Sequence, residues 1–338
     1  MPLTSAAAER LAREAATGSF ERTANALRID WLVSWDRKQI QRWSEKIGAA
    51  LIEQRDQEHM EFLCGHPPES PANPPELLVI GPDGGRVQFR DPDPETGHRW
   101  REDKVLAVSS YLPGNGRDVP PERLTTTYMA TMGAVQEFSE LCGLEALRRG
   151  LRSAKRVIAL ADCGTWIGTV LEHVCPDAVR IADWRHAQEY LYDAAAAWKG
   201  KGTPKAHALT EELEMHLWEG RVNEVIRTLR KGSRLKGAPR ANDPQDHPRR
   251  TIARALSYFQ NNHAYMNYPY YRAQGWPIGS GVTEAGVKQF NKRVKGSEQF
   301  WSEEGVETIL ALRANYQSQD DRWTRYWSSR PAYFKKAA

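Results

Sequence analysis

The chain has 338 residues, of which 40% are hydrophobic and 27% charged, and its formal net charge is +4. This length and composition are typical of a soluble globular protein with two or three domains, and they argue against a disordered or membrane-spanning chain. We find no apolar run of about 18 residues and no basic segment followed by an apolar one at the start, so we expect a cytoplasmic protein without membrane contact. The mild positive charge permits nucleic-acid binding without requiring it.

The four cysteines, Cys64, Cys142, Cys163 and Cys175, are scattered along the chain. They form no CxxC pair and have no paired histidines at zinc-finger spacing. This pattern predicts reduced, mostly buried thiols and argues against a zinc module or a disulfide framework.

The N-terminal segment, residues 1–62, reads as helical. Two amphipathic stretches, residues 21–28 and 36–50, flank a break at Ile29 and Asp30, which is the layout of a DNA-binding helix-turn-helix. An ordinary pair of short helices is an equally good interpretation. Residues 63–75 contain the run GHPPESPANPP, whose prolines predict a linker.

Strands are predicted beyond the linker. Residues 77–80 and 86–89 flank Pro82-Asp83-Gly84-Gly85, and Asp-Gly favours the tight turn of a hairpin. Residues 104–111 predict a third strand, and we expect a helix over about 124–151. Residues 157–161 and 178–182 are apolar strand candidates on either side of a helical stretch, 165–174, which is the pattern of a βαβ unit. Together these elements predict a mixed sheet.

The rest of the chain is predicted to be mainly helical. Residues 189–198, 206–218, 222–229 and 252–261 are helix candidates, and residues 227–250 are rich in Arg, Lys, Gly and Pro and read as a mobile basic loop. Two further helices are expected over 282–294 and 302–315. We see no internal repeat.

Acidic residues fall where chemistry is expected. Asp162 and Asp183 each follow an apolar strand, and the carboxyl ends of parallel strands carry ligand groups in open α/β sheets. Each could instead cap the helix that follows it. Asp83 could simply form a hairpin turn. Glu284 follows Gly279-Ser280-Gly281 at a helix start, where close backbone approach to a ligand is feasible; the alternative is a solvated face with Glu-Lys pairing.

Asp83, Asp162 and Glu284, if brought together, would repel one another unless a cation lay among them. Mg²⁺ or Mn²⁺ prefers such oxygen ligands, and two ions about 4 Å apart can catalyse the cutting and joining of phosphodiesters.

His186 lies one helical turn beyond Asp183 and could bind metal or phosphate, or make a structural hydrogen bond. Trp276 and Tyr271 could stack on bases, although the core is the better prediction for tryptophans. The DNA-contacting candidates are Arg185, Lys288, Asn291, Lys292, Arg293, Lys295 and Trp301.

Several segments resemble the ISKra-type DDE transposases of bacterial insertion sequences. They are LLVIGPDGGRVQFR, HRWREDKV, ALADCGTWI, HVCPDAVRIADWRHAQEYL and the long block from WPIGSGVTEAGVK to ETILALRA, and together they span about residues 76–328. The resemblance implies a ribonuclease-H-like core, metal-dependent action on DNA and Asp83, Asp162 and Glu284 as the acidic positions. It also marks the segment around Asp183 and His186. The sequence departs from the family at Asp162-Cys163-Gly164, at Ser297-Glu298-Gln299 and in its short N-terminal region.

The expected organisation is a catalytic core in two parts, residues 76–186 and 276–330, separated by a helical insertion, residues 187–275, and followed by a tail, 331–338. The expected partners are transposon-end and target DNA, bound by a homodimer or larger assembly in the bacterial nucleoid. The alternatives are a metal-dependent nuclease of the same fold and a catalytically inactive DNA-binding derivative.

Overall fold

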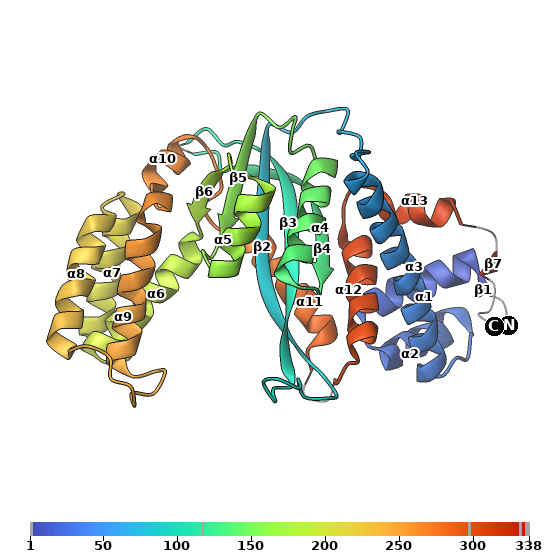
Figure 1. Cartoon of the computed structure of the whole chain (residues 1–338), viewed down its shortest axis with the longest axis horizontal. Helices are drawn as coiled ribbons and strands as arrows, with labels where there is room; N and C mark the ends of the chain where they lie inside the picture. The colour runs from blue at the N-terminus through green and yellow to red at the C-terminus, as the bar shows by residue number, and fades with distance from the viewer. Residues whose placement is uncertain (1–2, 117, 297–298, 331–332, 335–338) are drawn as a thin grey trace.

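The structure of the protein, a computed structural model, describes residues 3–116, 118–296, 299–330 and 333–334. A central β-sheet lies between two helical regions, one formed by the N-terminal helices and the other by a helical bundle that projects from the opposite side (Figure 1). None of the described helices is long and apolar enough to cross a bilayer. The predicted tail, residues 331–338, lies mostly outside the described residues.

The central sheet has five strands in the order β4-β3-β2-β5-β6. Three of them, β2 (Leu77–Gln88), β3 (Trp100–Leu112) and β4 (Glu122–Thr131), form an antiparallel meander. The other two, β5 (Arg156–Ala161) and β6 (Val179–Ala182), run parallel to β2 and are connected through α5 (Thr165–Val174). The predicted mixed α/β sheet and its βαβ unit are therefore confirmed.

The predicted hairpin around Asp83 is wrong, because β2 continues without a turn from Leu77 to Gln88 and pairs with β3 along its whole length. Pro82 is tolerated in this strand because β5 stops pairing with β2 at Ile80, which leaves Pro82 with a strand partner on one side only. The chain reverses later, between β2 and β3 (Figure 1).

The helix predicted over residues 124–151 is also wrong in its first part. The Thr-rich run that includes Thr125, Thr126 and Thr127 belongs to strand β4 and pairs with β3, and the helix α4 extends only over Val135–Arg148. β-Branched residues favour this extended conformation.

The two faces of the sheet carry separate cores. Along β2, Leu78 and Ile80 point to the face covered by α4 and α5, where they pack with Phe138 and Ile167. Val87, on the opposite face, packs with Phe290 of α11 (Gly281–Val294). Helix α11 also contacts α12 (Glu303–Gln317). Since side chains alternate along a strand, Asp83 and Gly85 lie on the α11 face with Val87.

The N-terminal region consists of α1 (Ser5–Thr17), α2 (Phe20–Trp31) and the long helix α3 (Arg37–Leu63). The break predicted at Ile29 and Asp30 is wrong, since α2 includes both residues. Helix α3 packs along α12 as well as on α1 and α2, so the described contacts explain it as a structural helix and do not confirm a helix-turn-helix. The short strands β1 (Leu3–Thr4) and β7 (Tyr333–Phe334) pair with each other.

The helical segment between β6 and α11 forms a bundle (Figure 1), and its buried residues are continuous with those on one face of the sheet, such as Val79 and Leu160. Its helices are α6 (Trp184–Lys199), α7 (Pro204–Trp218), α8 (Val222–Lys236) and α9 (Pro248–Asn262), followed by a 3-10 turn, η1 (His263–Tyr265), and α10 (Tyr268–Ala273). The basic stretch predicted as a loop over 227–250 is therefore wrong for residues 227–236, which are helical, and for 248–250, which begin α9.

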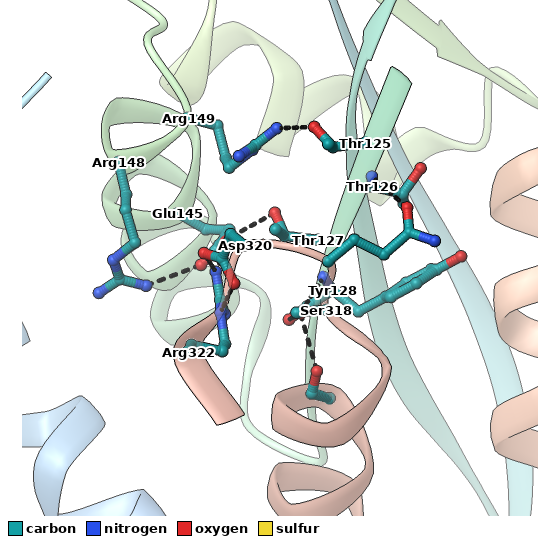
Figure 2. A network of polar contacts seen from close by, with 12 residues as sticks. Thr125, Thr126, Thr127, Tyr128, Glu145, Arg148, Arg149, Ser318, Asp320 and Arg322 are labelled. Atoms are coloured by element: carbon teal, nitrogen blue, oxygen red, sulfur yellow. Dashed lines mark hydrogen bonds and ion pairs between the residues drawn. The ribbon is translucent and has the colours of Figure 1, made fainter. Parts of the chain in front are cut away.

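A buried polar network joins β4, α4 and the C-terminal helix α13 (Arg322–Ser328) (Figure 2). Glu145 is 2% exposed and accepts hydrogen bonds from Thr127 (2.5 Å), Arg148 (2.8 Å) and Arg322 (2.6 Å). Burial alone would raise the pKa of Glu145, but the two guanidinium groups and the hydrogen bonds lower it to about 2. Arg322 also pairs with Asp320, so the buried charges compensate one another.

Candidate active site

Asp83 lies in the middle of the central strand. It is opposite Val105 of β3 and on the face covered by α11. Its Oδ1 atom accepts a hydrogen bond of 2.7 Å from the main-chain N–H of Gly84. The side chain is therefore displayed from a paired strand, which positions it more rigidly than the hairpin tip expected from the sequence.

A glycine on β2 lets α11 come close to the sheet. A Cβ atom built on Gly81 would overlap the hydroxyl of Thr283 and would lie 3.3 Å from the Leu160 carbonyl oxygen. Thr283 immediately precedes Glu284 in the first turn of α11. The absence of a side chain at Gly81 thus permits the approach that brings Glu284 toward Asp83.

Glu284 has one engaged and one free carboxylate oxygen. Oε2 forms an ion pair with Lys288 at 3.1 Å, and the Glu284 side chain is 15% exposed. Oε1 is buried and has no hydrogen-bond partner among the described residues. A buried carboxylate oxygen without a donor is costly, and a cation near it would remove that cost.

Asp162 follows β5 directly. Its Oδ1 accepts from Gly164 N–H at 2.8 Å, while α5 begins after Gly164 without any side-chain cap. The capping alternative for Asp162 is therefore not what the structure has. Cys163 adopts a left-handed conformation, with φ of 66°, which turns the chain sharply between the strand and the helix. Such a conformation is uncommon for a residue with a side chain.

The pKa of Asp83 responds to the charges of the other two carboxylates. Burial raises the pKa of Asp83 to about 6; the Gly84 hydrogen bond and His186 lower it, whereas the charges of Asp162 and Glu284 raise it. Within the described residues, however, no three His, Cys, Asp or Glu side chains gather tightly enough to hold one metal ion between them. The carboxylates share a neighbourhood without forming a closed ligand set.

Asp183 has a structural role next to the site. It is fully buried, and its Oδ1 accepts from His186 N–H at 2.9 Å as the N-cap of α6, which is the capping alternative. Its Oδ2 accepts from Ser280 N–H at 2.5 Å, just before α11. Because both oxygens bind main-chain N–H groups, Asp183 is a positioning residue between the bundle and α11.

His186 lies between acidic side chains. Its Nε2 is 3.9 Å from Asp162 Oδ2 and its Nδ1 is 3.4 Å from Glu189 Oε2. Burial lowers the pKa of His186, but Asp183, Asp162 and Glu189 together raise it above the ordinary value. The neighbouring carboxylates thus favour the protonated form of the His186 imidazole.

The candidate DNA contacts divide by exposure. Arg185, Lys288, Lys292 and Lys295 are exposed. Arg293 is 2% exposed and donates to the Ala15 carbonyl, and Trp301 is 6% exposed and donates to the Val294 carbonyl. We therefore remove Arg293 and Trp301 from the proposed DNA-contacting set, because these side chains pack α1 and the loop after α11. Trp276 and Tyr271 are likewise buried.

Asp103 of β3 is a buried acid that sequence reasoning missed. It is fully buried, neither of its side-chain oxygens has a hydrogen-bond partner among the described residues, and burial raises its pKa to about 6. A Cβ built on Gly85 would lie 2.5 Å from Asp103 Oδ1 and 2.7 Å from Asn291 Oδ1. Asn291, predicted to contact DNA, thus directs its amide oxygen to the sheet. The sequence signal was Asp103 preceding the apolar part of a strand.

Comparisons with known proteins identify no family for this chain. No protein-family profile matches the chain, and no curated protein matches it. Among solved structures, the chain is similar to the Drosophila P element transposase strand transfer complex, with 9% sequence identity and a TM-score of 0.42 over 95% of this chain and 94% of that chain. A similarity at this level establishes neither a family nor an activity for this protein.

Proposed function

We propose that the chain is a DDE-type DNA transposase of the ISKra kind with a ribonuclease-H-like core. The observation that carries the proposal is the placement of three acids: Asp83 lies on the central strand, Asp162 follows the adjacent parallel strand, and Glu284 lies in the first turn of α11, which packs on β2. The mixed strand order, with three antiparallel strands followed by two parallel ones, supports this fold. Acids at the carboxyl end of a parallel strand and on the facing helix suit phosphoryl chemistry.

Asp83, Asp162 and Glu284 would hold Mg²⁺ or Mn²⁺, with two ions expected. The donor set is made of oxygen atoms, Glu284 Oε1 lacks a partner, and the pKa of Asp83 is raised to about 6, so these residues suit a hard cation. When bound, such ions activate a water or a 3′-hydroxyl and stabilise the departing oxygen of a phosphodiester. The ions would have to draw the carboxylates closer and compete with Lys288 for Glu284.

The other side chains would bind and orient the DNA. Exposed Arg185, Lys288, Lys292 and Lys295 would hold phosphates of the transposon end and the target. His186 would attract the reacting phosphate beside Asp162, and Asp183 would hold α6 and α11 in register. Two ends must be joined, so we expect a homodimer or larger assembly on DNA.

The test is cleavage and strand transfer with Mg²⁺ or Mn²⁺ on DNA carrying the ends of the element. Asp162→Asn and Glu284→Gln should each lower the rate by about a hundredfold or more, since each removes a metal ligand. Glu211→Gln, at an exposed position of α7, is the matched control and should leave the rate unchanged. Full activity of both site variants would overturn the assignment.

The products also separate this proposal from its alternatives. Cleavage without joining would favour a metal-dependent nuclease. DNA binding without metal-dependent cleavage would favour an inactive DNA-binding derivative.

A further inference from the structure

Positive charge is concentrated in one part of the helical bundle. Residues 222–254 contain nine lysines and arginines and three acidic residues, a net charge of +6, whereas the whole chain carries +4. The remainder of the protein is therefore slightly acidic. This segment covers α8, the loop after it and the first half of α9.

Helix α8 presents much of this charge on one face. Val225, Ile226, Leu229 and Gly232 are buried against the rest of the bundle. Four cations at helical spacing, Arg227, Arg230, Lys231 and Arg234, are exposed. Residues three, four and seven positions apart lie on the same side of a helix, so these four form a basic stripe, about 10 Å long at 1.5 Å per residue.

Most of the basic stripe is not neutralised within the protein. Arg227 pairs with Glu224, but no carboxylate of the described residues forms an ion pair with Arg230, Lys231 or Arg234. The neighbouring loop differs, because Arg249 is paired with Asp243 at 2.6 Å. Stabilisation of the helix dipole would explain Arg234, in the last turn, but not Arg230 or Lys231.

A hollow beside the stripe has matching chemistry. It lies between α8 and α9 and is lined by Asn223, Ile226, Arg227, Arg230, Gln260 and His263. The lining includes no carboxylate and combines Arg230, which has no acidic partner among the described residues, and Arg227, which is paired with Glu224, with the polar side chains of Asn223, Gln260 and His263. This combination suits the oxygen atoms of a phosphate better than a protein surface of mixed charge.

We propose that the basic stripe of α8 and the adjoining hollow bind the phosphate backbone of duplex DNA, away from the carboxylate site. The bundle projects from the side of the sheet, so α8 lies apart from the sheet that carries the candidate site (Figure 1). The proposal rests on the proposed function for its choice of DNA. Because the contacts are with phosphates, binding at α8 should not depend on base sequence.

The experiment compares two triple variants of the full chain. Arg230→Gln/Lys231→Gln/Arg234→Gln removes three stripe cations without an acidic partner. Lys199→Gln/Lys201→Gln/Lys205→Gln removes three exposed cations near the α6–α7 connection of the same bundle. Both lower the net charge equally, and glutamine preserves helix propensity. Binding to a 30-base-pair duplex of arbitrary sequence is measured by fluorescence anisotropy, in EDTA, between about 50 and 200 mM salt.

The stripe variant should bind about 10- to 100-fold more weakly than the wild type near 100 mM salt, and its slope of log K against log salt should be shallower by about 2 to 3. The control variant should change the slope by less than about 1. Equal affinities and slopes for both triple variants, or no duplex binding by the wild type, would overturn the proposal.

The test of the DNA-binding surface on α8 and the test of the proposed catalytic site can give different results. A weakened stripe variant together with fully active Asp162→Asn and Glu284→Gln proteins would retain the DNA surface and reject the catalytic site. An unaffected stripe variant with metal-dependent strand transfer would do the reverse.

Discussion

Asp183 and Ser280 are joined by a buried hydrogen bond in which the Ser280 N–H donates to Asp183 Oδ2 at 2.5 Å. The bond connects the end of β6 with the start of α11, although the whole helical bundle intervenes in the sequence. Trp184 N–H also donates to the Ile278 carbonyl, at 2.9 Å. These bonds fix where the chain re-enters the sheet region, and hence where Glu284 lies.

Asp183→Asn should lower the free energy of unfolding by about 1–3 kcal/mol, because the amide nitrogen cannot accept the hydrogen bond that one of the two buried N–H groups now makes. Urea denaturation at neutral pH measures this. Ser280→Ala is the control, since the bond uses the main-chain N–H of that residue. Equal losses in both variants would contradict the account.

Gly81→Ala should separate α11 from β2, because the added methyl group would overlap Thr283. We expect a loss of stability of about 1–3 kcal/mol, as for overpacking in a core. Combining it with Thr283→Ala should recover part of that loss by removing the overlapping hydroxyl. A double-mutant cycle on denaturation free energies tests the coupling, and strictly additive effects would show that the two residues do not meet.

Glu145 predicts an acid-sensitive contribution to stability. Its pKa is lowered to about 2 in the folded protein, so the contribution is complete above the unfolded value near 4.5 and is lost as the pH falls toward 2. Glu145→Gln should cost about 3 kcal/mol at pH 7, and this difference should shrink between about pH 4.5 and pH 2. A difference that stayed constant over that range would contradict the network in Figure 2.

The buried Asp103 should give the opposite dependence of stability on pH. Burial raises its pKa to about 6, so the folded state binds the proton more tightly and stability falls as the pH rises from about 4 through 6. Asp103→Asn should therefore stabilise the protein by about 3 kcal/mol at pH 8 and have little effect near pH 4. Denaturation at both values checks this; a variant less stable than the wild type at pH 8 would refute it.

The sequence predicted those parts of the fold in which local pattern and tertiary context agree. The apolar runs before Asp162 and Asp183, with the helix between them, became β5, α5 and β6. The apolar positions Val287, Phe290 and Val294 became the buried face of α11. In both cases the spacing of the apolar residues along the sequence matches the pattern of buried side chains.

Prediction from the sequence failed where contacts between residues far apart in the chain determine the local structure. Gly84 and Gly85 suggested a turn, but both lie within β2 and pair with β3, and a Cβ atom on Gly85 would lie 2.5 Å from Oδ1 of the buried Asp103. Thr125 to Thr127 are extended because β3 pairs with them. The basic residue Arg293 was assigned to DNA, yet it donates to the carbonyl of Ala15 from a helix remote in sequence. No local window contains these partners.

Binding of Mn²⁺ to the full chain, followed by electron paramagnetic resonance, tests the central claim without knowledge of the DNA substrate. The wild type should bind up to two ions, and Asp83→Asn, Asp162→Asn and Glu284→Gln should each weaken binding about tenfold or more, while Glu211→Gln should not. Binding by all three site variants with wild-type affinity would contradict a shared metal site.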